Sequence, residues 1–264
     1  MAFRFQLRHT IRVALVMLGL ASALFARPAL AATDFTDLWW NPAEPGWGVN
    51  FVQADNFIFA TFFIYDATNK PTWYTGELSR DANGQWKGPL YRSTGSYFGA
   101  PFNSTLRDID QVGNVTFISS SESSGSLTYN VESVSASKPI VRQTLQMISL
   151  SGTYSGALIT DVYNCDDGSP LRTLHRFIDA SASQSVGGAS QLSFSFAGGG
   201  TCSFNGNATQ LGQLFRMDNA TYTCGVGPAT VYELKSTAQG IEGRWTAPLT
   251  GGCTEFGVFS AVLK

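Results

Sequence analysis

Charge and histidine are scarce in this chain of 264 residues: 14% of the residues are charged and only two are histidines. The chain also has no Cys-x-x-Cys pair, no Gly-x-Ser-x-Gly string and no glycine-rich loop that precedes a helix. These absences argue against a zinc site, a hydrolase with a nucleophile elbow and a nucleotide enzyme, respectively. His175 stands between Leu174 and Arg176 without a companion motif. We therefore expect no bound metal and no cofactor.

Apolar runs of membrane-spanning length are missing as well. Val13–Phe25 is apolar but too short for a membrane span. Three arginines precede this run, and Ala29-Leu30-Ala31 follows it with the small-x-small pattern of a signal-peptide cleavage site. We predict a signal peptide over residues 1–31, cleavage near Ala31 and a secreted or periplasmic protein. An uncleaved N-terminal anchor is the alternative.

Basic residues become a minority once this segment is removed, because it holds four of the 17 Lys and Arg and none of the 19 acidic residues. A protein that binds nucleic acid needs a basic face to neutralise phosphates. Attachment to anionic lipid head groups needs a basic patch too. The mature chain is acidic, so we expect no nucleic-acid partner and no electrostatic attachment to a membrane.

The four cysteines all lie in the second half, at Cys165, Cys202, Cys224 and Cys253. An even number of cysteines in an exported chain predicts disulfides, since the compartment is oxidising. We expect two disulfides, and three pairings are open.

Short strand-like segments separated by turn residues dominate the rest of the chain. Phe57–Tyr65 is apolar on both faces, which predicts a central strand covered on both sides. Asp66–Pro71 and Asp81–Gly84 have the composition of turns. The pattern predicts an all-β fold, an antiparallel meander of hairpins with a barrel-like or sandwich-like architecture.

A shift in composition near Ser151-Gly152 divides the chain, because five of the six Trp precede it and all four Cys follow it. We predict a Trp-rich β module over residues 34–150 and a disulfide-containing β module over 151–264. In the second module, the apolar residues of Leu171–Ala180 are spaced as in a helix, but we interpret this segment as a strand. Val134–Ser137 and Asn205-Gly206 are expected to be turns.

The densest signal is Trp39–Asn50, which holds three Trp, two Pro and two Gly in twelve residues. Pro stiffens the backbone, and Gly permits tight turns or close approach of a ligand. Trp39–Gly48 resembles the signature of a family of secreted bacterial proteins with a Trp-Trp-Asn-Pro-x-Glu-x-Gly-Trp-Gly motif. The similarity continues through later segments: Phe59–Asp66, Lys70–Tyr74, Gly88–Arg92, Thr94-Gly95, Val141–Gln143 and the surroundings of Cys202, Cys224 and Cys253. This resemblance implies export and an all-β architecture, and it carries over no activity and no catalytic residue.

A Trp cluster on a rigid loop has two interpretations: the rings fill a core, or they form a stacking surface for a sugar or another amphipathic ligand. The second interpretation predicts a binding region that also includes aromatic residues of the neighbouring strands, with Trp73 and Trp86 sharing a face. Its candidate residues are Trp39, Trp40, Asn41, Glu44, Trp47, Trp73, Tyr74, Trp86 and Tyr91.

Three functions follow as hypotheses. The first is a non-catalytic module that binds an envelope glycan or other amphipathic molecule through the Trp-rich region. The second is a glycoside hydrolase in which Glu44, against aromatic walls, is the general acid; it needs a second carboxylate across the bond. The third is a structural or envelope-assembly protein with an exposed apolar surface. An integral outer-membrane barrel is disfavoured, because most strands keep no apolar outward face.

Overall fold

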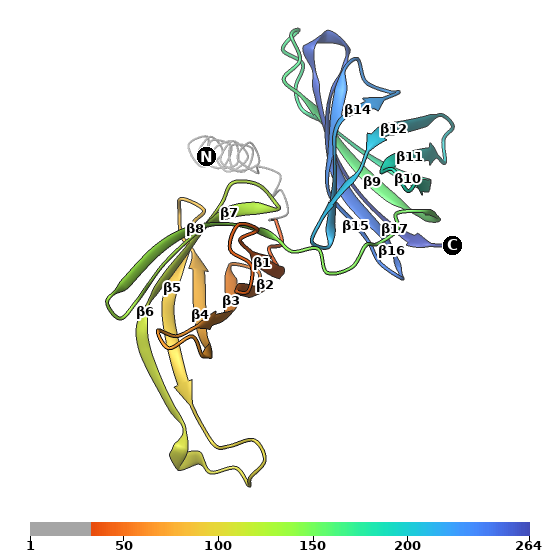
Figure 1. Cartoon of the computed structure of the whole chain (residues 1–264). Helices are drawn as coiled ribbons and strands as arrows, with labels where there is room; N and C mark the ends of the chain where they lie inside the picture. The colour runs from red at the N-terminus through yellow and green to blue at the C-terminus, as the bar shows by residue number, and fades with distance from the viewer. Residues whose placement is uncertain (1–32) are drawn as a thin grey trace, which may run out of the picture. The chain divides into compact units, whose positions relative to one another are not determined.

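The computed structural model describes residues 33–264, so the expected signal peptide over 1–31 lies outside the described residues. The described chain forms seventeen strands in two antiparallel sheets, each closed into a barrel (Figure 1). The all-β expectation is confirmed, and both sheets are barrels. No helix in the described part of the chain has the length and apolar character of a membrane span.

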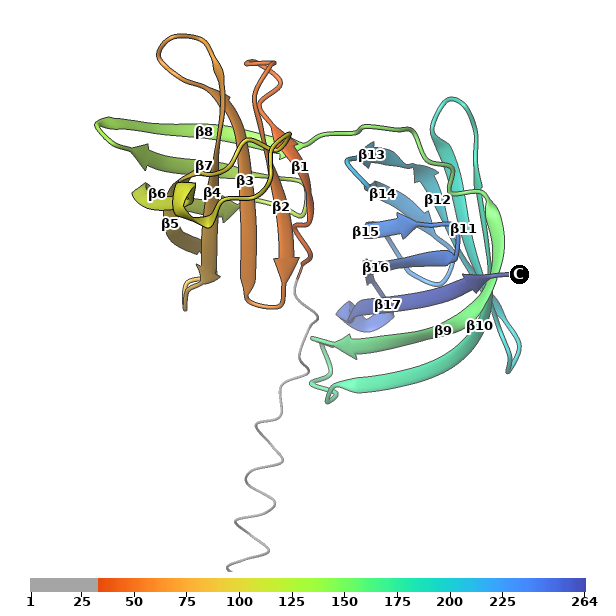
Figure 2. The ribbon, with the colours of Figure 1, turned by 90° about the horizontal axis from the view of Figure 1, so that it is seen from below.

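The first barrel is an eight-stranded meander in which each strand pairs with the next, and the last pairs with the first (Figure 2). Its strands are β1 (Asp37–Trp40), β2 (Gly48–Ala54), β3 (Phe57–Tyr65), β4 (Pro71–Arg80), β5 (Trp86–Thr94), β6 (Asp108–Ser119), β7 (Ser124–Val131) and β8 (Val134–Arg142). Between β5 and β6 lies a long exposed loop with one 3₁₀ turn, Ser104–Leu106.

The second sheet runs in the order β12-β11-β10-β9-β17-β16-β15-β14-β13, and pairing of β12 with β14 closes it. Its strands are β9 (Gly152–Tyr163), β10 (Arg172–Gln184), β11 (Ala189–Phe196), β12 (Thr201–Asn207), β13 (Thr209–Leu211), β14 (Leu214–Tyr222), β15 (Pro228–Ser236), β16 (Gly240–Pro248) and β17 (Thr254–Leu263). A second 3₁₀ turn, Thr250–Gly252, precedes β17. The strand interpretation of Leu171–Ala180 is therefore confirmed.

Turn residues act as their chemistry predicts. Asp66 Oδ1 accepts hydrogen bonds from the backbone N–H groups of Thr68 and Lys70, at 2.8 and 3.0 Å. Asp81 does the same for the β4–β5 turn, where Gly84 has a φ of +77°. A carboxylate that bonds its own backbone stabilises a reversal of the chain, so these turns fix the register of the hairpins.

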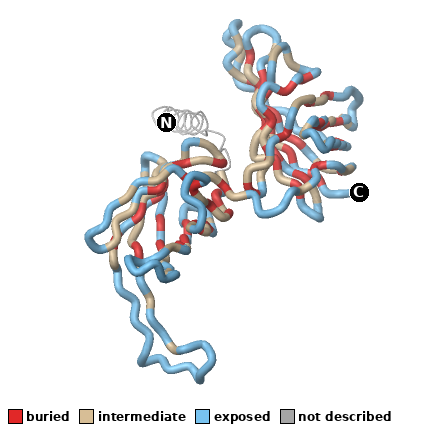
Figure 3. Tube along the Cα trace, in the orientation of Figure 1, coloured by how far each residue is buried: buried red, intermediate tan, exposed pale blue. Residues whose placement is uncertain are grey.

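Burial alternates along the strands, as expected where one face of a sheet lines the core (Figure 3). The prediction that β3 is covered on both sides is wrong. Ile58, Ala60 and Phe62 are buried, whereas Phe57, Phe59, Phe63 and Tyr65 are exposed. A closed barrel has only one inner face, so one face of β3 must meet solvent whatever its composition.

Two predicted turns are also wrong, because both lie inside strands. Val134–Ser137 begins β8, where it pairs with β7, and Asn205-Gly206 pairs with β11 in β12. A local dipeptide preference is outweighed here by a complete ladder of backbone hydrogen bonds on the neighbouring strand.

Arg142 is buried at the point where β8 meets β1. Its guanidinium donates to the carbonyl oxygens of Glu122, at 2.7 Å, and Thr36, at 3.1 Å. It also donates to the carbonyl of Asp34 and to the carboxylate of Asp37, the latter at 3.2 Å. Burial lowers the pKa of Arg142, and the bond to Asp37 opposes that shift. Each of the three guanidinium nitrogens therefore has a partner where water is excluded.

Replacing Arg142 with Met should lower the free energy of unfolding by about 3–5 kcal/mol, because Asp37 becomes a buried charge without its cation. Urea unfolding followed by circular dichroism measures the change. Arg92→Met is the matched control: Arg92 pairs with Glu132 at 3.0 Å near the surface, so its loss should change stability by less than about 1 kcal/mol. Equal effects of the two variants would contradict the role assigned to Arg142.

All four cysteines are paired, Cys165 with Cys253 and Cys202 with Cys224. The expectation of two disulfides is confirmed, and both are consistent with an oxidising compartment. They close chain segments of different length, 88 and 22 residues of sequence separation. A longer closed loop restricts the unfolded chain more.

We therefore expect the Cys165→Ala, Cys253→Ala variant to lose about 4–5 kcal/mol of stability and the Cys202→Ala, Cys224→Ala variant about 3 kcal/mol. Urea unfolding of both oxidised variants under the same conditions gives the comparison. A larger loss for the short loop would mean that native contacts, rather than loop closure, set the contribution of each disulfide.

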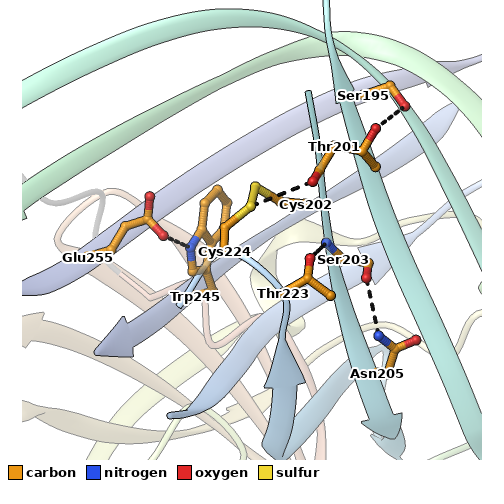
Figure 4. The surroundings of a disulfide bond; sticks show 9 residues. All are labelled: Ser195, Thr201, Cys202, Ser203, Asn205, Thr223, Cys224, Trp245 and Glu255. Carbon is orange, nitrogen blue, oxygen red and sulfur yellow. Dashed lines mark hydrogen bonds between the residues drawn. A yellow bond between two sulfur atoms is a disulfide. The ribbon is translucent and has the colours of Figure 1, made fainter. Parts of the chain in front are cut away.

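Next to the Cys202–Cys224 disulfide, Trp245 and Glu255 meet inside the second barrel (Figure 4). Trp245 Nε1 donates to Glu255 Oε2 at 3.2 Å. A Cβ on Gly257 would lie 2.0 Å from the Trp245 indole, so glycine is needed for the ring to lie there. Burial raises the pKa of Tyr222, and the nearby Glu255 carboxylate, to which Tyr222 also hydrogen-bonds, raises it further.

This shift predicts a loss of stability in alkali. Since the folded pKa of Tyr222 exceeds its ordinary value of about 10, its stabilising effect is complete below pH 10 and falls as the pH rises further. Tyr222→Phe should be less stable than the wild type by about 1 kcal/mol at pH 8. That gap should narrow at about pH 11.

Urea midpoints at the two pH values test this prediction. Tyr97→Phe, at an exposed tyrosine, is the control and should keep a constant difference from the wild type. A Tyr222→Phe gap that is unchanged or wider in alkali would show that Tyr222 does not drive the loss.

Candidate functional site

The β1–β2 loop, residues 41–47, is held by its own backbone and by Asn41. Asn41 Oδ1 accepts from Ala43 N–H at 3.1 Å, and the Asn41 carbonyl accepts from Glu44 N–H at 3.0 Å. The Asn41 side chain is buried, and Gly46 has a φ of +113° that other residues rarely adopt. Asn41 therefore positions the loop and is not available to an external ligand.

Two of the expected binding residues are core residues, which corrects the prediction for them. Trp39 is fully buried and its Nε1 donates to the carbonyl of Phe35 at 3.0 Å. Trp86 is 1% exposed. The expectation that Trp86 shares a face with Trp73 is wrong, because Trp86 pairs with Arg80, which lies on the opposite face of β4 from Trp73.

Glu44 forms a small polar cluster with Trp47 and Lys138. Lys138 Nζ lies 2.5 Å from Glu44 Oε2, and Trp47 Nε1 donates to the same oxygen at 3.1 Å. The Lys138 ammonium also lies 5.6 Å from the centre of the Trp47 ring. The hydrogen bond from Lys138 lowers the pKa of Glu44 below its ordinary value. A general acid needs a raised pKa, so this geometry counts against the hydrolase hypothesis.

Aromatic side chains gather on the outer face of β3 and β4. Phe63 and Trp73 are directly paired across the strands, and Tyr65 pairs with Pro71. Phe63, Tyr65 and Trp73 are 53%, 55% and 49% exposed. Next to Phe63 on β2 is Gly48, which has no side chain to cover the ring.

These side chains line a shallow groove of about 230 Å³. Gly46 also lines the groove, and a Cβ there would lie 4.0 Å from the Tyr65 ring. We call this feature the aromatic groove and define it by Gly46, Phe63, Tyr65, Pro71 and Trp73.

The remaining candidates lie apart from the groove. Trp40 is half-buried opposite Val141 of β8. Trp47 and Tyr74 are partly buried against the core of the first barrel. Tyr91 is half-buried and pairs with Thr75. Of the predicted aromatic residues, only Trp73 is part of the groove.

Sequence reasoning missed Phe63, Tyr65 and Lys138. The hairpin turn at Asp66–Lys70 fixes the pairing of Phe63 with Trp73, so the first two could have been found from the register. Lys138 is 94 residues from Glu44 in sequence, and no local pattern connects the two.

Among residues 33–264, no cluster of three or more His, Cys, Asp or Glu side chains is placed to hold a metal ion. Comparison of the chain with protein-family models gives no match, and neither curated proteins nor solved structures match it. The resemblance to the Trp-Trp-Asn-Pro family thus rests on the sequence segments alone, and a function must be inferred from the geometry of the site.

Proposed function

We propose that this protein is an exported, non-catalytic β protein whose first barrel binds an envelope glycan through the aromatic groove. The observation that carries the proposal is the exposure of three neighbouring rings, Phe63, Tyr65 and Trp73, on two fully paired strands. Export follows from the expected signal peptide over 1–31 and is supported by the two disulfides.

The chemistry of the groove suits a sugar. The C–H faces of a pyranose ring are apolar, while its edge carries hydroxyl groups. Trp and Tyr offer a flat apolar face together with one polar atom, which suits both parts of a sugar ring. Because β3 and β4 hold the rings in place before binding, little conformational entropy is lost when a ligand stacks on them.

The size of the groove sets how much ligand it covers. Its volume of about 230 Å³ lies below the roughly 300–1,000 Å³ typical of cavities that enclose a small molecule. The groove therefore suits contact with one ring of a longer chain, which a polymeric glycan provides.

A second candidate is an apolar protein partner, as an envelope-assembly role requires. The observation that favours it is a second exposed apolar patch on β2 and β3, at Val52, Phe57 and Phe59. Val52 pairs with Phe59 across the two strands, and the row Asn50–Thr61–Thr75 separates this patch from the groove. This candidate predicts that a partner protein binds through Phe59 and that no sugar is required.

Replacing Trp73 with Ala should weaken glycan binding about tenfold, because a stacked ring contributes on the order of 1 kcal/mol beyond its buried area. Isothermal titration with soluble peptidoglycan fragments and chito-oligosaccharides gives the affinity. Phe98→Ala is the matched control, since Phe98 is 95% exposed in the β5–β6 loop, outside the groove.

Neither variant should change the urea midpoint, because both side chains are exposed. Trp73→Phe should also remove the largest part of the emission that iodide quenches, since Trp39, Trp86 and Trp245 are buried. Failure of the wild type to bind any glycan, or equal weakening by both alanine variants, would contradict the proposal. Absence of glycan binding in the wild type, together with binding of an envelope protein that Phe59→Ala abolishes, would point to the second candidate.

A further inference from the structure

The second barrel contains a cavity of about 440 Å³ that the proposed glycan site does not use. Its walls come from β9, β10, β11, β12, β14, β16 and β17, together with the β11–β12 turn and Leu249. Leu158, Leu174, Phe194 and Leu249 provide an apolar lining. A volume of this size falls in the usual range for cavities that bind small molecules.

The cavity is open because β10 is longer than its neighbour. Ile178–Ala182 pair with β9 on one side and β11 on the other. Arg172–Arg176 pair with β9 alone. The first half of β10 therefore leaves the barrel wall incomplete beside the β11–β12 turn, where Gly199 and Gly200 border the cavity.

Strand alternation directs two arginines into this opening. Ile178, Ala180 and Ala182 are the inward residues of β10, so Arg172, Leu174 and Arg176 continue the same face. Both arginines line the cavity. The Arg176 guanidinium lies 4.6 Å from the centre of the Phe196 ring, which fixes its position by a cation–π contact.

Neither arginine is neutralised within the described chain. Among residues 33–264, no carboxylate oxygen lies within ion-pair distance of Arg172 or Arg176. Hydrogen bonds from Ser169 lower the pKa of Asp167, and the charge of Arg172 lowers it by a smaller amount. The cavity holds one carboxylate, Glu255, and it is engaged by Trp245 and Tyr222.

The positions of these charges orient a ligand. Arg172 pairs with Val162 of β9, which pairs in turn with Glu255 of β17. Two strand spacings therefore separate Arg172 from Glu255, about 10 Å. An anionic group is repelled from the Glu255 side and attracted to the arginines at the opening.

We propose that this cavity binds an amphipathic molecule with one carboxylate head group and an apolar tail. The head group lies between Arg172 and Arg176, whose planar guanidinium groups match a carboxylate with paired hydrogen bonds. The tail lies against Leu158, Leu174 and Phe194. The site is separate from the aromatic groove, so neither proposal depends on the other.

A series of ligands with one tail and three head groups tests the charge requirement in the wild-type protein. Isothermal titration compares octanoate, octanol and octylammonium. We expect octanoate to bind about tenfold more tightly than octanol, because charge-assisted hydrogen bonds to arginine are stronger than those of a neutral hydroxyl. We expect octylammonium to show no binding. Octanoate binding no tighter than that of octanol would overturn the proposal without any variant.

Variants locate the site. Arg172→Gln and Arg176→Gln should each weaken octanoate binding about tenfold and leave octanol binding unchanged. Leu174→Trp should abolish binding of both ligands by filling the cavity. Arg107→Gln, at an exposed arginine of the first barrel, is the matched control and should change nothing. Circular dichroism and the urea midpoint verify that each variant is folded. The assignment would be overturned if the control lost octanoate binding, or if both arginine variants bound octanoate as tightly as the wild type.

Discussion

Two residue pairs close the first barrel, Trp39 with Arg142 and Trp40 with Val141. The position of the β1–β2 loop relative to β8 depends on this narrow seam. A sheet that is not closed exposes two edge strands with unpaired backbone groups. Here Arg142 supplies hydrogen-bond donors to carbonyls on both sides of the seam and an ion pair to Asp37. Its guanidinium also lies 5.0 Å from the centre of the Trp39 ring. Closure places β8 beside the β1–β2 loop, so that Lys138 can reach Glu44.

The seam shows how a buried charge can be tolerated in a barrel of this size. Moving an arginine out of water is unfavourable unless its donors are satisfied. No buried side-chain nitrogen or oxygen in the described residues lacks a hydrogen-bond partner. The Trp-rich motif contributes to the same region: Trp39 fills the core and Asn41 holds the loop. The Trp-rich string thus mainly stabilises the fold, and the exposed aromatic surface lies mainly on the next hairpin.

Local patterns predicted the strands better than they predicted which face of each strand is buried. Phe57–Tyr65 was delimited correctly, because Asp55-Asn56 and Asp66 mark its ends. Its two faces are equally apolar, however, and only the closed barrel decides that Phe62 is buried and Phe63 exposed. The same applies to Asn205-Gly206, which has the composition of a turn yet lies in a paired strand. Contacts such as Lys138–Glu44 depend on closure and have no local signal.

The two barrels differ in how their interiors are filled, and this difference explains why their candidate sites differ in kind. In the first barrel, the rings of Phe35, Trp39, Phe51 and Phe117 contact one another at centroid distances of 5.0–6.2 Å. Close-packed rings leave no room for a ligand, so a ligand of that barrel is expected on its outer face. In the second barrel, β10 extends beyond the pairing of β11, and its inward residues Arg172, Leu174 and Arg176 pair with β9 on one side only. An incomplete wall, rather than a larger barrel, creates the cavity there, and the two arginines at its opening give it a charge preference that the aromatic groove lacks.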